Sequence, residues 1–212
     1  MFALDQDITQ WENALPAVHG AARLPVLLPL CWHLRQRDGA RALHLAEEAQ
    51  RWLPQAELSP AAQQLALARL QLVRAEVQWL RGALDEAETL AQAAHAVLCA
   101  HGDGAACSDA HWLLASIAVD RGDHLRCTAQ LRLARQQASS AGDATRASLA
   151  DAATARWAVL RDAPAAQALW GSRFGADDQQ LPVPLAAWVH DFRGVLAYAS
   201  HDLGTAVGHY MQ

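Results

Sequence analysis

The sequence predicts an all-α protein in which antiparallel helix pairs stack into a right-handed superhelical solenoid. The first observation is a pattern that recurs about every 40 residues, in which a helix ends in a short turn and a small residue follows five positions later. The second is a composition rich in alanine and leucine, which favour helix. Arrays of stacked helices have repeats of this length. The three clearest copies begin at Arg81, Arg121 and Ser200, and their small residues are Ala87, Cys127 and Ala206.

The N-terminal part divides into a leading segment and a first helix pair. Residues 1–20 are expected to hold one helix, Asp5–Leu15, and residues 21–212 about five helix pairs. The first pair spans 24–53 and turns at Arg37-Asp38-Gly39, and Pro25 and Pro29 are both expected in the first turn of its first helix, where a missing N–H costs little.

The remaining pairs follow from turn and cap residues. Ser59-Pro60 has the residue types of an N-cap followed by the first helical position. The last pair is cut short at Gln212, so we expect the chain to be the N-terminal piece of a longer protein. Pair two is expected to turn at Gly82 and to end near Gly102, and pair three to start at Ser108 or Asp109 and to turn at Gly122. Pair four is expected to start near Thr145 and to turn at Arg161-Asp162. A loop from Gly171 precedes pair five, which is expected to run from Pro184 through His201-Asp202.

Small residues recur where the helices of a pair must approach closely. Ala75, Ala115 and Gly194 lie at one offset before their turns, and Ala87, Cys127, Ala166 and Ala206 lie after them. The chain therefore resembles the tetratricopeptide repeat family, whose second helix carries small residues seven apart, as in Ala42/Ala49, Ala87/Ala94 and Cys127/Ala134. The long repeats resemble the helical sensor regions of bacterial diguanylate cyclases and maltose-regulator-type activators.

Composition restricts the function classes. The formal net charge is −5, which argues against a nucleic-acid surface. No segment resembles a signal peptide or a membrane span, so a cytoplasmic protein with reduced thiols is expected.

Neither a metal site nor a catalytic site is predicted. The spacing of Cys99, His101, Cys107 and His111 matches no standard zinc arrangement, so no metal or other cofactor is expected. No hydrolase or phosphate-loop motif occurs, so this chain is not predicted to be an enzyme.

The predicted binding surface is the concave groove that the first helix of each pair would line. The resemblance places these residues at fixed offsets, and an aromatic ring beside a few charges suits a peptide groove. Packing between helices is an equal alternative for the rings. The residues are Arg69, Leu72, Glu76, Trp79, Asp109, Trp112, Ser116, Asp151, Trp188, Asp191 and Tyr198.

The expected function is a protein-interaction or sensor domain of a bacterial signalling protein, regulating a C-terminal output domain such as a diguanylate cyclase. The alternatives are the inducer-binding region of a transcription activator and a free-standing assembly adaptor. The expected partners are a protein or peptide in the groove and a second copy of the chain, with neither nucleic acid nor membrane.

Overall fold

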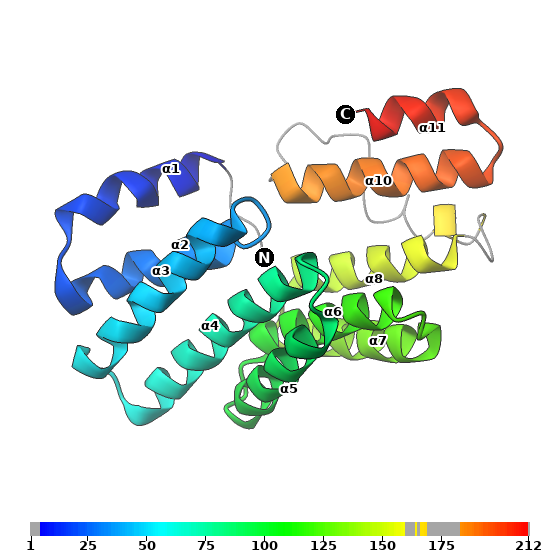
Figure 1. Cartoon of the computed structure of the whole chain (residues 1–212). Coiled ribbons are helices and arrows are strands. Elements are labelled where there is room, and N and C mark those ends of the chain that lie inside the picture. The colour runs from blue at the N-terminus through cyan, green and yellow to red at the C-terminus, as the bar shows by residue number, and fades with distance from the viewer. Residues whose placement is uncertain (1–4, 160–163, 165, 169–182, 212) are drawn as a thin grey trace.

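The computed structural model describes residues 5–159, 164, 166–168 and 183–211, and these residues form helices and turns without any strand. The prediction of an all-α fold is therefore confirmed for them. Figure 1 shows the helices following one another from α1 at the left to α11 at the upper right. Their bounds are α1 Asp5–Ala14, α2 Leu24–Leu34, α3 Gly39–Trp52, α4 Pro60–Leu80, α5 Leu84–Ala100, α6 Gly104–Asp120, α7 His124–Ser140, α8 Ala144–Ala158, α10 Val183–Ala199 and α11 Leu203–Tyr210.

One kind of turn joins successive helices from α4 to α8. Its glycine has a positive φ, of 78° at Gly82, 72° at Gly102, 75° at Gly122 and 70° at Gly142. Glycine adopts this conformation without the steric cost that a Cβ would bring. These four glycines are 20 positions apart, so the turn between two predicted pairs is the same as the turn within a pair.

The residue after the glycine caps the next helix. In three of these turns an aspartate carboxylate accepts the N–H of the third residue along: Asp103 from Ala106 at 3.1 Å, and Asp123 and Asp143 from Arg126 and Arg146, each at 2.9 Å. The expectation that a helix starts at Ser108 or Asp109 is therefore wrong, because the cap at Asp103 starts α6 at Gly104. The predicted cap at Ser59 is confirmed, since its Oγ accepts the N–H of Ala62.

Two further expectations concern residues at element ends. Pro25 lies in the first turn of α2 as predicted, but Pro29 lies inside that helix, because α2 starts at Leu24 and continues to Leu34. The turn at Arg161-Asp162 and the loop beginning at Gly171 lie outside the described residues.

Small residues lie where neighbouring helices pack against each other, as the sequence predicts. Ala75 and Ala87 are fully buried where α4 meets α5, and Ala115 and Cys127 are buried where α6 meets α7. Consecutive helices pack against one another, and α2 also contacts α4, α4 contacts α6 and α6 contacts α8. Buried residues of α8 and α10 belong to one hydrophobic cluster. The even-numbered helices therefore form a continuous layer, and this layer positions the candidate site.

The cysteines differ from the expectation of four reduced thiols. Cys99 and Cys107 form a disulfide, with their Cα atoms 5.6 Å apart, because the turn at Gly102 folds the end of α5 back on the start of α6. Cys31 and Cys127 are free and buried, and burial raises the pKa of Cys31 to about 12 and that of Cys127 to about 11. No helix in the described part of the chain combines the length and the apolar character that crossing a membrane requires.

We expect the free energy of unfolding to fall as the pH falls below about 6.5. The ring of His33 stacks on Trp11, and burial, supported by nearby positive charges, lowers the pKa of His33 from 6.5 to about 3. The unfolded chain therefore binds a proton at His33 more tightly than the folded chain. The part of the stability that depends on a neutral His33 is fully present above pH 6.5 and is lost as the pH falls from 6.5 to 3. Urea unfolding across this range should show a smaller slope for His33→Phe than for the exposed control His44→Gln. Equal slopes for the two variants would contradict the assignment to His33.

Candidate functional site

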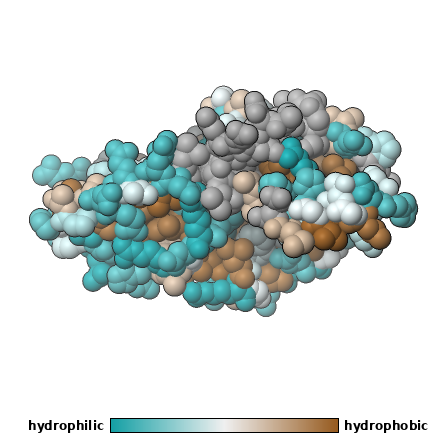
Figure 2. Space-filling view, turned by 90° about the horizontal axis from the view of Figure 1, so that it is seen from above, coloured by the Kyte–Doolittle hydropathy of each residue, from teal (hydrophilic) through white to brown (hydrophobic). Residues whose placement is uncertain are grey.

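A cavity of about 300 Å³ opens between α4, α6, α8 and α10. Four indole rings line it: Trp79 from α4, Trp112 from α6, Trp157 from α8 and Trp188 from α10. The rings of Trp112 and Trp188 lie close together, with centroids 5.7 Å apart and planes at 59°. Figure 2 shows apolar residues reaching the surface of the molecule in separate patches among hydrophilic ones. Tryptophan-lined cavities of this size suit the apolar or aromatic part of a ligand.

Two polar groups of the cavity lie at the C-terminal end of α6, Ser116 and Asp120. Asp120 is exposed, and its carboxylate accepts the Nε1–H of Trp79 at 2.6 Å. Ser116 donates its hydroxyl to the backbone oxygen of Trp112 at 3.1 Å, which leaves the oxygen of that hydroxyl as an acceptor. Asp120 forms no ion pair with a cation of the described residues, so its charge remains available to a ligand.

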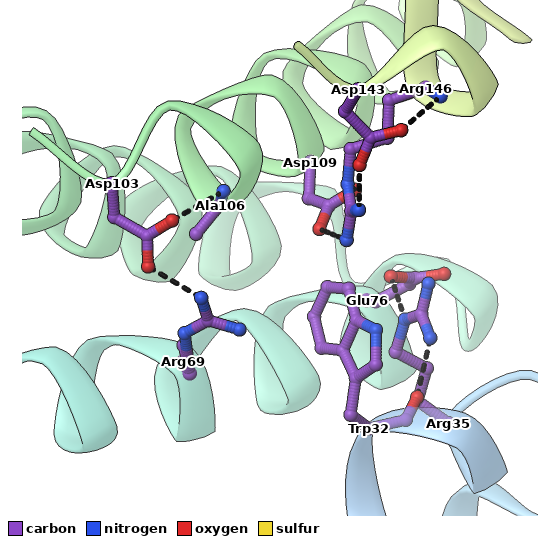
Figure 3. A network of polar contacts seen from close by, with 9 residues as sticks. All are labelled: Trp32, Arg35, Arg69, Glu76, Asp103, Ala106, Asp109, Asp143 and Arg146. Carbon is purple, nitrogen blue, oxygen red and sulfur yellow. Dashed lines mark hydrogen bonds and ion pairs between the residues drawn. The ribbon is translucent and has the colours of Figure 1, made fainter. Parts of the chain in front are cut away.

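Ion pairs join each even-numbered helix to the next along the layer. Arg35, just after α2, reaches Glu76 on α4 at 2.5 Å, and Gln36 also donates to this carboxylate. Both side chains of the Arg35–Glu76 pair are almost completely buried, and the Arg35 guanidinium also stacks on the ring of Trp32. Figure 3 shows this pair beside the equivalent contacts between α4, α6 and α8.

Two further arginine–aspartate ion pairs join α6 to α8 and α8 to α10. Arg146 on α8 donates two hydrogen bonds, of 2.8 and 2.9 Å, to the Asp109 carboxylate on α6, and it also forms an ion pair with Asp143 (Figure 3). Burial opposes the charge of Arg146, but the hydrogen bonds to Asp109 and Asp143 outweigh it and raise the pKa of Arg146. Arg156 on α8 pairs with Asp191 on α10 at 2.5 Å.

The structure brings together about half of the residues predicted for the groove. The members that line the cavity are Glu76, Trp79, Asp109, Trp112, Ser116 and Trp188. The other five lie elsewhere. Leu72 is buried in the core, Asp151 pairs with Arg135 of α7, and Asp191 pairs with Arg156. Arg69 pairs with Asp103 at the start of α6, and Tyr198 is 59% exposed on α10.

Sequence reasoning named Asp151 on α8 but missed the residues of this helix that line the cavity. Trp157 and Arg156 line the cavity, and the guanidinium of Arg156 lies 4.3 Å from the centroid of the Trp157 ring. The signal that could have found Arg156 is the turn at Gly142-Asp143. It lies 40 positions after the turn at Gly102-Asp103, so Ser116 of α6 corresponds to Arg156 of α8.

These features define an all-helical protein whose even-numbered helices hold an aromatic cavity, and a solved structure of the same helical-repeat-like class is similar to it. This similar structure is the crystal structure of BtubC (BKLC) from P. vanneervenii, with a TM-score of 0.62 and 14% sequence identity. The match covers 99% of this chain and 89% of that chain. No protein-family model and no curated protein sequence matches the chain. At this identity the likeness shows the fold alone.

Proposed function

We propose that the chain is a tetratricopeptide-like solenoid that works as a binding domain and takes its partner in the tryptophan-lined cavity. The observation that carries the proposal is the convergence of four indole rings from four helices on one cavity of about 300 Å³. Tryptophan is enriched among the residues that contribute most to binding free energy at protein interfaces. The lining groups Glu76, Asp109 and Arg156 are already held in ion pairs within the chain, whereas the rings line a space that a ligand can fill.

The chemistry of the lining favours a partner that carries a positive charge. The lining arginines, Arg35 and Arg156, are paired with Glu76 and Asp191. Asp109 is paired with Arg146, so Asp120 is the lining carboxylate without a cationic partner among the described residues. A cation beside indole faces gains both ion pairing and cation–π attraction. The partner proposed is a peptide that inserts an arginine or lysine side chain.

We expect Trp112→Ala to abolish or strongly weaken peptide binding, because Trp112 and Trp188 pack against each other in the lining of the cavity. The probe is a random peptide library displayed on phage, selected on the whole chain and sequenced. Selected peptides should be rich in arginine or lysine, and their affinity is then measured for each variant by fluorescence polarisation.

Two variants complete this test. Asp120→Asn should weaken the basic peptides while Tyr198→Ala, which lies outside the cavity, should leave their affinity unchanged. If no peptide is selected, or if the selected peptides bind Trp112→Ala as tightly as the parent chain, the cavity is not the binding site.

A regulatory role follows as the wider proposal. The chain would be the sensor region of a bacterial signalling protein whose C-terminal output domain, such as a diguanylate cyclase, responds to the bound peptide. The resemblance of the long repeats to such regions supports it. The alternative is the inducer-binding region of a transcription activator, in which a small cation would occupy the cavity, and reading the gene beyond Gln212 separates the two.

A second copy of the chain is a further proposed partner, favoured by the apolar side chains exposed on the last two helices. Tyr198, Leu203, Val207 and Met211 are each more than half exposed. Light scattering over a concentration series should detect a dimer that Tyr198→Glu weakens. A strict monomer of the parent chain at high concentration would contradict self-association.

A further inference from the structure

Four side chains with metal-binding chemistry face one another between α5 and α6. His95 and Cys99 are one helical turn apart on α5, and Cys107 and His111 are one turn apart on α6. The three-residue turn that joins the helices places Cys99 opposite Cys107 and His95 opposite His111. The cysteine Cα atoms are 5.6 Å apart, and the histidine Nε2 atoms are 3.1 Å apart.

The orientation of His111 is fixed from outside this group. Its Nδ1 lies 2.7 Å from Oε1 of Gln130, which belongs to α7. An amide oxygen only accepts hydrogen bonds, so Nδ1 of His111 carries the proton and Nε2 presents its lone pair toward His95. Metal-binding histidines in proteins have this arrangement, in which an outer hydrogen bond sets the tautomer and aims the other nitrogen at the ion.

A cysteine binds a metal as its thiolate, which Cys99 and Cys107 do not supply while they are joined in a disulfide. With Cys99 and Cys107 joined, the described residues contain no group of three or more histidine, cysteine or carboxylate side chains that could hold a metal ion. Reduction changes the donor set, because it adds two sulfur ligands beside two histidine nitrogens. Two cysteines and two histidines are a standard tetrahedral zinc set, in which the two nitrogens lie about 3.3 Å apart.

We propose that reduction of the Cys99–Cys107 disulfide creates a zinc site formed by His95, Cys99, Cys107 and His111. A dithiol reductant transfers two electrons and two protons to the disulfide, giving two cysteine thiols, and is itself oxidised to a disulfide. Zinc then replaces the two thiol protons, which are released to solvent, and forms bonds to both sulfurs and to both Nε2 atoms. The same two helices are thus joined by a disulfide under oxidising conditions and by zinc under reducing ones.

The test measures zinc binding by the whole chain, purified without a histidine tag, in its oxidised and reduced forms. A water-soluble phosphine serves as reductant and becomes the phosphine oxide. We expect one zinc per reduced chain, none per oxidised chain, and release of two protons for each zinc bound at a pH where the thiols are protonated. Cobalt added in place of zinc should give the visible absorption of a tetrahedral ion with thiolate ligands.

Four variants identify the ligands. His95→Ala should lower zinc affinity at least tenfold, Gln130→Ala should lower it about 10–100-fold, and Cys99→Ala with Cys107→Ala should abolish the cobalt spectrum. His101→Ala is the matched control, because His101 lies two residues from Cys99 but hydrogen-bonds to Gln64 on α4. The zinc affinity of His101→Ala should equal that of the parent chain. Circular dichroism verifies that each variant is folded. Absence of zinc from the reduced parent chain, or equal affinities of folded His95→Ala and His101→Ala, would overturn the proposal.

Discussion

Replacing Arg35 with methionine is expected to lower the free energy of unfolding by about 3–5 kcal/mol. The substitution leaves the Glu76 carboxylate, whose side chain is 7% exposed, without the guanidinium that compensates its burial. Gln36 still donates a hydrogen bond to Glu76, but a neutral amide does not replace a cation. Glu76→Leu should also lower the free energy of unfolding, because the buried Arg35 guanidinium loses the carboxylate with which it pairs.

Urea unfolding of four variants tests this expectation. The double variant Arg35→Met with Glu76→Leu should be much less destabilised than the sum of the single variants, because no buried charge remains. Arg69→Ala is the control, since Arg69 forms a comparable helix-to-helix ion pair with Asp103 but is 48% exposed, and about 0–1 kcal/mol is expected. Single and control variants of equal stability would show that the Arg35–Glu76 pair is not buried in solution.

Ala87→Leu is expected to lower the free energy of unfolding by about 1–3 kcal/mol. Ala87 is completely buried in the cluster shared by α4, α5 and α6, where Ala75 of the facing helix is also completely buried. A leucine there has no space, so it must push α5 away from α4 or adopt a strained rotamer. The measurement is urea or thermal unfolding followed by circular dichroism.

The control for this variant lies on the same helix. Ala93 is exposed on α5, so Ala93→Leu adds the same atoms without crowding a neighbour and should change stability little. Equal unfolding midpoints for Ala87→Leu and Ala93→Leu would mean that α5 does not pack on α4 through Ala87.

Most helices and the small residues at their contacts could be predicted from the sequence, because both depend on local chemistry. Glycine followed by aspartate stops one helix and caps the next, and a buried alanine marks a close approach. The start of α6 was missed because Gly102-Asp103 was treated as the end of a pair, although it has the same chemistry as Gly122-Asp123.

The candidate site was harder to predict because it depends on contacts between residues that are far apart in the chain. Trp79, Trp112 and Trp188 were found from their offsets, but no offset shows that Asp109 pairs with Arg146, 37 positions away. The disulfide was missed for a related reason. The spacing of Cys99 and Cys107 has meaning only once the intervening turn is known to reverse the chain.

The equal spacing of the glycine turns has a consequence for how chains of this kind change in length. Asp103–Gly142 is a block of 40 residues that begins just after one such glycine and ends on another. Excising it in the gene would join Gly102 directly to Asp143 and regenerate the same stop and cap at the junction. Duplicating it would place Gly142 before a second copy of Asp103, with the same result. Recombination can therefore add or remove whole helix pairs while every remaining helix keeps its own start and end signals.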